Sequence, residues 1–156
     1  MKEAVGNIWD SNADAIVITT NGFVKKDGSC VMGRGIALEA KARVPHIEYW
    51  LGDRINKEGN HVHIYWEALG HYNGHEGTEW YTDLVTFPVK HNWWEEADLE
   101  LIERSAKELF DASEYPAWTS VALPRPGCGN GKLNWEDVKP IIEPYLSDRF
   151  TVYSLW

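Results

Sequence analysis

The order of apolar and polar residues along the chain predicts alternating strands and helices. Continuous apolar runs rich in β-branched residues, such as DAIVIT at residues 14–19, are typical of strands buried on both faces. Residues 61–67 instead alternate polar and apolar side chains, which is the period of a half-exposed strand. The strands predicted from these patterns cover residues 2–8, 14–19, 61–67, 80–89, 120–124 and 150–155.

Helices are predicted between these strands, where apolar residues recur three and four positions apart. They cover residues 35–44, 47–57, 98–112 and a last segment that begins at Asn134. The first helix ends before Pro45, because the residue that precedes a proline is disfavoured in the helical region. Asn134 is a good N-cap for the last helix, in which Pro140 and Pro144 predict a bend. Residues 70–77, with the sequence GHYNGHEG, are predicted to form a loop or hairpin turn.

This alternation over 156 residues predicts an α/β fold with helices on both faces of one sheet, in a single domain spanning residues 1–156. Ligands of such folds bind at the carboxyl ends of the strands. Two glycine-rich loops, at residues 33–36 and 127–132, follow predicted strands and precede predicted helices. We therefore expect both loops to lie at the ligand-binding edge of the sheet.

The first loop has Gly33 and Gly35 on either side of Arg34, directly before a helix. Glycine permits positive φ and close approach of a ligand to the backbone, and the amides that open a helix favour an anion. A tight turn that uses glycine only for its geometry explains the same pattern.

In the second loop, Gly127, Gly129 and Gly131 alternate between a predicted buried strand and the cap of the last helix. Alternating glycines weaken a fold unless the backbone bends sharply or approaches a ligand. A nest of amides around a diphosphate supplies such a reason, and an elaborate turn is the alternative. Together the two loops predict a phosphate-bearing nucleotide as ligand. The chain lacks both GxGxxG and GxxxxGK[ST], the fingerprints of dinucleotide folds and P-loops.

Composition narrows the range of partners. A net charge of −9 and a pI of about 5.1 argue against sequence-independent binding to a nucleic-acid backbone, which requires a basic surface. Cys30 and Cys128 form no CxxC pair, which favours a reducing, cytoplasmic setting. The first ten residues lack the apolar run of a signal peptide, and no stretch approaches the roughly 18 apolar residues of a membrane span.

Several segments resemble the macrodomain family, in sequence and in their order along the chain. They are NADAIVITTNG, VMGRGIA, FPVKHNWWEEADLELIE, and LPRPGCGNGKLNWEDVKPIIEPYL followed by FTVYSL. The PxxGCGxGxLxW pattern resembles the branch that contains the terminal ADP-ribose glycohydrolases and the DarG antitoxins, rather than the MacroD-type branch. The resemblance implies a three-layer α/β/α fold around a mixed sheet, with ADP-ribose in its crevice.

The resemblance also implies which residues bind the ligand. Asn21 and the first loop are expected along the distal ribose and the phosphates, and the second loop is expected to wrap the diphosphate from the other side. Asn7 stands where the family has an aspartate that reads adenine; its amide oxygen still accepts a hydrogen bond but carries no charge. The ligand-binding residues implied in this way are Asn7, Ile8, Asn21, Gly33, Arg34, Gly35, Ile36, Gly127, Cys128, Gly129, Asn130, Gly131 and Lys132.

The chain departs from the terminal glycohydrolases at one position. They have a catalytic aspartate two residues after GCG, where this chain has Gly131, as the DarG pattern also does. The insertion at residues 24–30 is longer than in most relatives and is expected to form a lid or an edge hairpin over the distal ribose.

The segment FPVKHNW resembles a DarG segment with a catalytic lysine, which implies that role for Lys90. Lysine acts on the bond at the anomeric carbon only when it is partly unprotonated, which requires desolvation or a nearby positive charge. Three actions stay open: attack that forms a Schiff base with the opened sugar, positioning of water, or stabilisation of the leaving group. A solvated lysine at a strand end is the alternative without catalysis.

Other residues invite further hypotheses. His61, His63, His71 and His75 suggest a metal site, but they fall in a glycine-containing loop and an alternating strand, so no metal is expected. Cys128 has no evident base beside it and is expected to pack under the second loop. The segment from Trp93 to Glu95 either shapes the acceptor side of the site or caps the following helix.

The sequence therefore predicts an enzyme that binds ADP-ribose and hydrolyses the bond between its distal ribose and an acceptor. An ADP-ribose 1″-phosphate phosphatase and a non-catalytic reader or sponge for ADP-ribose are the alternatives. No cofactor is implied. We expect a monomer away from membranes that meets nucleic acid only as a modified substrate, and the acceptor stays open between a DNA base, a protein side chain and a phosphate.

Overall fold

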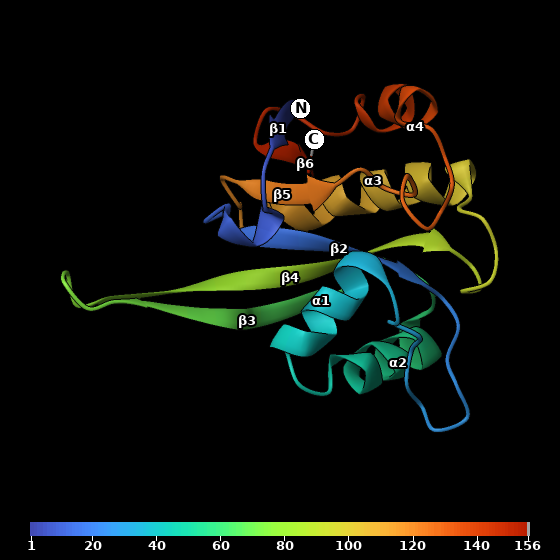
Figure 1. The fold of residues 1–156 in the computed structure, drawn as a ribbon, viewed down its shortest axis with the longest axis horizontal. Helices are drawn as coiled ribbons and strands as arrows, with labels where there is room; N and C mark the ends of the chain where they lie inside the picture. The colour runs from blue at the N-terminus through green and yellow to red at the C-terminus, as the bar shows by residue number, and fades with distance from the viewer. Residues whose placement is uncertain (156) are drawn as a thin grey trace.

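The computed structural model describes residues 1–155 and shows a six-stranded mixed sheet between two layers of helices (Figure 1). The strand order is β1-β6-β5-β2-β4-β3, and only β3 runs antiparallel to its neighbour. The strands are β1 (Lys2–Val5), β2 (Ala15–Asn21), β3 (Ile64–Asn73), β4 (Thr78–Lys90), β5 (Val121–Pro124) and β6 (Phe150–Ser154). The predicted three-layer α/β/α fold with a mixed sheet is confirmed.

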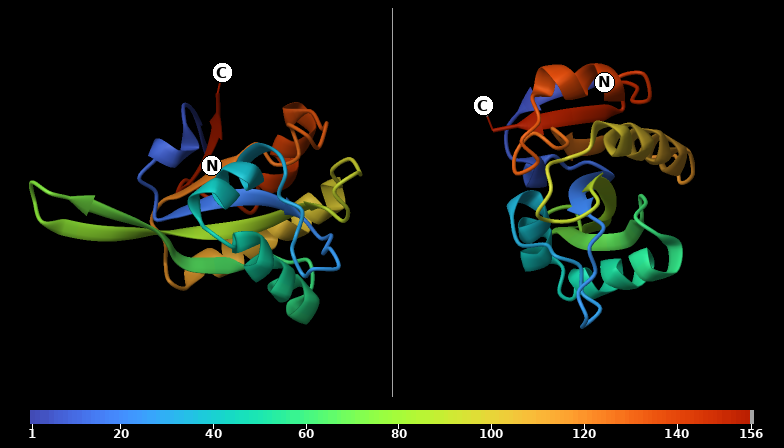
Figure 2. Two further views of the ribbon diagram at one scale, coloured as in Figure 1. Left: turned by 60° about the horizontal axis from the view of Figure 1, so that its bottom comes forward. Right: turned by 90° about the vertical axis from the view of Figure 1, so that its right-hand side faces the viewer.

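The helices divide between the two faces of the sheet (Figures 1 and 2). They are η1 (Ile8–Asp10), a short 3-10 helix, α1 (Gly35–Arg43), α2 (Ile47–Glu58), α3 (Leu99–Glu114) and α4 (Trp135–Ile142). One apolar cluster joins α3 and α4 to the sheet, and a second joins η1, α1 and α2 to its other face. Because β2, β4 and β5 contribute residues to both clusters, these strands are buried on both faces. The continuous apolar run of residues 14–19 predicted this for β2.

The β3–β4 hairpin differs from its prediction. Residues 61–63 precede β3, and residues 70–73, predicted as loop, belong to it, so the turn is confined to residues 74–77. The two strands continue beyond the sheet as a two-stranded arm that projects from the body of the molecule (Figure 1). Antiparallel pairing with β4 satisfies the backbone of this segment, which overrides the weak strand propensity of Gly70 and Asn73.

The last helix is shorter than predicted. Asn134 is its N-cap, although its side chain makes no capping hydrogen bond, and the helix ends at Ile142. Pro144 lacks the N–H that would continue the helix, so Tyr145 and Leu146 lie beyond the end of the helix. Among residues 1–155, no helix is long and apolar enough to span a membrane.

Candidate functional site

A cleft of about 640 Å³ lies at the carboxyl ends of β2, β4 and β5. These strands are parallel neighbours, so the segments that follow them meet at one edge of the sheet. In the strand register Asn21 and Lys90 are opposite one another, at the ends of β2 and β4. Both residues line the cleft together with the two glycine-rich loops. The volume lies in the range of about 300–1,000 Å³ that is usual for small-molecule sites.

Most of the predicted ligand-binding residues line this cleft, and three do not. Those that line it are Asn21, Gly33, Arg34, Gly35, Ile36, Gly127, Gly129, Asn130, Gly131 and Lys132, and Lys90, the predicted catalytic residue, lines it too. Asn7 is exposed, and its Oδ1 accepts a hydrogen bond of 3.0 Å from the N–H of Trp9, as N-cap of η1. Ile8 is buried in the apolar cluster beneath α1, and Cys128 packs against the opposite cluster. The roles of Asn7, Ile8 and Cys128 toward a ligand stay predictions.

The first loop presents unpaired backbone donors at the start of α1. Arg34 is the N-cap and makes no side-chain capping bond, and the N–H groups of Gly33, Gly35 and Ile36 have no backbone acceptor among the described residues. Gly35 has a φ of 58°, which favours glycine. A Cβ on Gly33 would meet nothing within 4 Å. Free amides at a helix N-terminus beside a cleft favour a bound anion.

The glycines of the second loop serve two different purposes. Gly127 has a φ of 74° and accepts a hydrogen bond of 2.9 Å from the N–H of Leu133, which closes the turn. A Cβ on Gly131 would overlap the carbonyl oxygen of Gly127 and lie 2.8 Å from the Cβ of Ala97. At Gly129, in contrast, nothing lies within 4 Å of such a Cβ. Gly127 and Gly131 therefore allow the tight turn, whereas Gly129 leaves cleft space open.

The second loop also carries unpaired donors. The N–H groups of Gly129, Asn130 and Gly131 find no backbone acceptor within residues 1–155. Across the cleft, Asn130 Nδ2 would lie 3.5 Å from a Cβ on Gly35, so the two loops approach one another closely. Two sets of free amides on opposite sides of one cleft suit a diphosphate.

Asn21 shapes the chain that leads to the first loop. Its Nδ2 donates a hydrogen bond of 2.9 Å to the carbonyl of Val31, and its Oδ1 accepts one of 3.0 Å from the N–H of Phe23. The amide group is thereby held by the segment after β2. Contact between Asn21 and the distal ribose stays a prediction.

The insertion at residues 24–30 is an edge hairpin rather than a lid. A β-bridge joins Val24 to Cys30, and the carbonyl of Glu48 in α2 accepts a hydrogen bond of 2.8 Å from the N–H of Cys30. The carbonyl of Gly28 lies so close to Gly52 of α2 that no Cβ fits there. These contacts attach the hairpin to α2, and its residues do not line the cleft.

Lys90 lies between the second loop and the segment that follows β4. Its Nζ donates hydrogen bonds to the carbonyls of Trp93 and Asn130, both at 3.3 Å. Partial burial lowers the pKa of Lys90 below its ordinary value, and the positive charges of Lys132 and Arg34 lower it further. This direction increases the share of free amine, which catalysis by lysine requires.

Asn60 supports Lys90, and no motif or periodicity in the sequence predicted this role. Its Nδ2 donates a hydrogen bond of 3.1 Å to the carbonyl of Lys90, which also accepts one of 3.2 Å from the N–H of Gly22. The Asn60 side chain fills the space beside Gly22, where a Cβ would lie 2.6 Å from Nδ2. Asn60 belongs to the connection between α2 and β3, far from both glycine-rich loops in the sequence.

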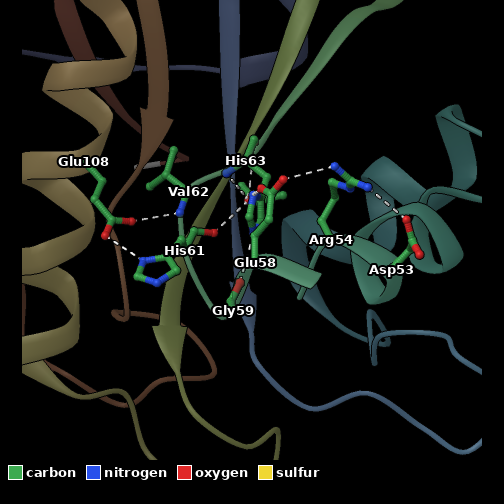
Figure 3. A network of polar contacts seen from close by, with 9 residues as sticks. Asp53, Arg54, Glu58, Gly59, His61, Val62, His63 and Glu108 are labelled. Atoms are coloured by element: carbon green, nitrogen blue, oxygen red, sulfur yellow. Dashed lines mark hydrogen bonds and ion pairs between the residues drawn. The ribbon is translucent and has the colours of Figure 1, made fainter. Parts of the chain in front are cut away.

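Polar contacts with α3 and α2 hold the connection that carries Asn60 (Figure 3). Glu108 of α3 accepts a hydrogen bond of 2.9 Å from the N–H of Val62 and lies 2.8 Å from Nδ1 of His61. The ring of buried His63 contacts the carbonyl of Gly59 at 3.0 Å. This network fixes the backbone from which Asn60 reaches Lys90.

The residues after Lys90 form one wall of the cleft. Trp93, Trp94, Glu95 and Glu96 all line it, and the two tryptophans are 50% and 58% exposed. The cap of α3 is Asp98, whose carboxylate accepts a hydrogen bond of 3.0 Å from the N–H of Glu100. Because Asp98 caps α3, residues 93–95 do not serve as its cap, and they form part of the cleft wall instead.

The other candidates are engaged elsewhere. Burial raises the pKa of the Cys128 thiol to about 11, which disfavours a nucleophilic thiolate. His71 stacks on Trp80 and contacts Oγ1 of Thr82 at 2.9 Å. Within residues 1–155, no group of three His, Cys, Asp or Glu side chains is arranged to hold a metal ion.

Known proteins resemble this chain in sequence and in fold. No protein-family model matches the chain. The chain is 30% identical over 141 residues to a DNA ADP-ribosyl glycohydrolase of Thermus aquaticus, covering 90% of this chain and 36% of the relative. It is 29% identical over 138 residues to that of Mycobacterium tuberculosis, covering 86% of this chain and 35% of the relative. The chain thus spans about a third of the length of these curated relatives.

Solved structures resemble the fold over almost the whole chain. The macrodomain of Thermus aquaticus DarG aligns with a TM-score of 0.73 and 26% identity, covering 97% of this chain and 95% of that one. Thermosipho africanus DarTG in complex with ADP-ribose aligns with a TM-score of 0.79 and 21% identity, covering 97% of this chain and 41% of that one.

Proposed function

We propose that this chain, which the comparisons support as a macrodomain of the DarG-like branch, binds ADP-ribose in the cleft and removes it from DNA. The relatives are DNA ADP-ribosyl glycohydrolases, and the chain aligns with their macrodomain over nearly its full length. The observation that carries the proposal is the pair of facing loops with free amides at the cleft beside Lys90.

The diphosphate and the distal ribose each have a proposed partner in the cleft. The amides of the first loop and of residues 129–131 hold the diphosphate, where an anion needs donors rather than net positive charge. The distal ribose lies between Asn21 and Lys90, the opposed residues at the ends of β2 and β4. Lys90 thereby meets the anomeric carbon, at which the acceptor is attached.

The reaction is a hydrolysis that needs no cofactor. The bond between the anomeric carbon and the acceptor breaks. Water supplies the hydroxyl group on the anomeric carbon of the released ADP-ribose, and the remaining proton of that water goes to the acceptor. Lys90 acts on this bond with a free amine, which its lowered pKa supports. An aspartate of the kind found in terminal glycohydrolases has no room at Gly131, which favours a lysine-based mechanism.

The proposal extends to the molecular setting. We propose that the chain is a monomer and that it works in a reducing compartment such as the cytoplasm. The free thiols of Cys30 and Cys128 support the reducing compartment. Light scattering of the purified chain tests whether it is a monomer. The single-domain extent over residues 1–156 is part of the same proposal.

Calorimetry with ADP-ribose and AMP tests the binding proposal. We expect low-micromolar affinity for ADP-ribose, about −8 kcal/mol, because both loops engage the diphosphate. AMP lacks the second phosphate and the distal ribose, so it should bind far more weakly. Equal affinities for the two nucleotides would contradict the two-loop site.

A further inference from the structure

The β3–β4 arm carries a set of exposed aromatic side chains. The arm consists of residues 66–81 and extends away from the body of the molecule (Figure 1). Four of its aromatic residues are between 39% and 67% exposed: Trp66, Tyr72, Trp80 and Tyr81. None of the four lines the cleft. Tryptophan and tyrosine are enriched at protein–protein interfaces, so this surface is a candidate for contact with a partner.

The base of the arm is tied to the body of the protein. Asp83 accepts a hydrogen bond of 2.7 Å from the N–H of Glu67 and one of 2.9 Å from the indole N–H of Trp118. Trp66 packs beside Trp118, with ring centroids 6.3 Å apart. The pairing register of β3 and β4 also shifts next to Glu67, and bulges of this kind redirect a strand. A partner therefore meets an arm that is already oriented, which lowers the entropic cost of binding.

Trp80 is positioned by its neighbours in the arm. Its cross-strand partner His71 stacks on it, with ring centroids 5.0 Å apart and planes 19° apart. The His71 ring also contacts Oγ1 of Thr82 at 2.9 Å. The Trp80 ring is thus held in place while remaining open to solvent.

Both long edges of the arm lack a neighbouring strand. β3 is the last strand of the sheet, and β4 pairs with β2 only from Asp83 to Lys90. Within residues 1–155, the backbone of residues 78–82 therefore has no strand on the side away from β3. Natural sheets protect such edges with lysine or proline, yet residues 64–82 contain no lysine, arginine or proline. An extended segment can add to an open edge through main-chain hydrogen bonds.

The arm is acidic. Glu67, Glu76 and Glu79 are exposed and make no ion pair within residues 1–155. Residues 66–81 thus carry three carboxylates and no lysine or arginine, so they repel a nucleic-acid strand and the same arm of a second copy. Arginine pairs with carboxylates and also stacks on tryptophan and tyrosine, so it suits both features of the arm.

We infer that the β4 edge of the arm is a docking site for an extended segment of another protein in which arginine alternates with apolar residues. The segment adds as a further strand beside residues 78–82. Successive side chains of a strand point to opposite faces, so Glu79 and Tyr81 share one face and Trp80 lies on the other. The arginines of the added strand lie beside Glu79 and Tyr81, and its apolar residues lie beside Trp80. This docking does not involve the cleft and goes beyond the proposed function.

Peptide binding to the wild-type chain tests the inference. The probes are a peptide of alternating arginine and valine, the same peptide with glutamate for arginine, and a third with proline for valine. The proline peptide keeps the positive charge but cannot extend the sheet, because proline fixes φ and has no N–H. We expect only the arginine–valine peptide to bind. At a peptide concentration of about ten times Kd, hydrogen exchange of the edge-facing amides among residues 78–82 should slow by about tenfold.

Variants of β4 assign the binding to the arm. Glu79→Lys should weaken binding of the arginine–valine peptide by about tenfold and allow the glutamate–valine peptide to bind, because the cross-strand charge pair is reversed. Trp80→Ala should weaken binding by about threefold through the lost apolar contact. Asp111→Lys makes the same charge change at an exposed acid of α3 and should alter Kd by less than about twofold. The Kd of ADP-ribose should be unchanged in all three variants, which also shows that they fold.

Each other outcome overturns the inference. Equal binding of the proline peptide means that charge alone attracts the probe, and equal losses in Asp111→Lys and Glu79→Lys mean the same. Slowed exchange confined to residues 69–73 places the added strand on the β3 edge. Self-association that is lost in Trp80→Ala assigns the arm to a second copy of the chain. No binding of the arginine–valine peptide at millimolar concentration leaves the arm without this role.

Discussion

The side-chain amide of Asn60 donates a hydrogen bond of 3.1 Å to the backbone carbonyl of Lys90. The same carbonyl accepts from the N–H of Gly22, so one atom joins the ends of β2 and β4 and the connection after α2. Asn60 touches no ligand in the proposed site. Its role is to position the strand end from which the Lys90 amine reaches the cleft.

Asn60→Asp should therefore impair turnover without impairing binding of free ADP-ribose. The carboxylate keeps the shape of the side chain but faces the Lys90 carbonyl without a donor, at a cost of about 1–3 kcal/mol for the unmet hydrogen bond. If half of that cost is added to the barrier by displacement of Lys90, we expect kcat to fall by about two- to tenfold. Asn73→Asp in the arm is the control. Asn73 Oδ1 accepts hydrogen bonds from the N–H groups of His75 and Glu76, and an aspartate oxygen can accept the same bonds. A parallel loss of ADP-ribose affinity would make Asn60 a general structural residue.

Gly129→Glu should abolish ADP-ribose binding in a folded protein. A side chain at this position enters open space at the cleft and brings a negative charge to the diphosphate. Calorimetry should show at least a hundredfold loss of affinity, with an unchanged circular dichroism spectrum. Gly74→Glu, in the turn of the arm, provides the same substitution where a Cβ has ordinary room. Normal binding by folded Gly129→Glu would reduce the second loop to a turn.

Gly131→Ala should destabilise the fold, whereas Gly129→Ala should not. The added Cβ at residue 131 overlaps the carbonyl of Gly127 and crowds Ala97, and overpacking of this kind costs about 1–3 kcal/mol. Urea unfolding measures the difference. For the same reason, Gly131→Asp should fail to create the aspartate-based chemistry of the terminal glycohydrolases. A stable Gly131→Asp variant with increased turnover would contradict this account of the loop.

The pH dependence of turnover should reflect the lowered pKa of Lys90. If the free amine is the active form, kcat rises with pH as Lys90 loses its proton, and the rise occurs below the ordinary lysine pKa of 10.5. Lys132→Gln removes a positive charge that disfavours protonated Lys90, so the pKa rises and the profile moves to higher pH. Lys107→Gln, on the exposed side of α3, should leave the midpoint unchanged. A fall in kcat with rising pH would exclude the free amine.

The fold was largely predictable because most of it depends on local patterns. Continuous apolar runs identified β2 and β5, and the order of strands, loops and helices placed Asn21, Lys90 and both glycine-rich loops at one edge of the sheet. Residues 70–73 were misassigned because pairing with β4, not local propensity, makes them a strand.

The site was less predictable where it depends on contacts between distant segments. Asn60 shows no periodicity or motif, and only the folded chain brings it to Lys90. Asn7 was selected by its family position in the sequence, and its side-chain oxygen caps η1 outside the cleft, so its role toward adenine stays a prediction. The different purposes of Gly129 and Gly131 follow from what surrounds a Cβ at each position, which a glycine pattern does not reveal.

Turnover of single-stranded DNA that carries ADP-ribose on one base, by the wild-type chain and by Lys90→Ala, tests the central claim most directly. The account predicts release of ADP-ribose by the wild type and a rate reduced by about a hundredfold or more in Lys90→Ala, the scale of positioned acid–base or nucleophilic groups. The Kd of free ADP-ribose should stay within about twofold, because Lys90 acts at the bond and not at the diphosphate. Full activity of Lys90→Ala, or a wild type that binds ADP-ribose but releases none from DNA, would contradict it.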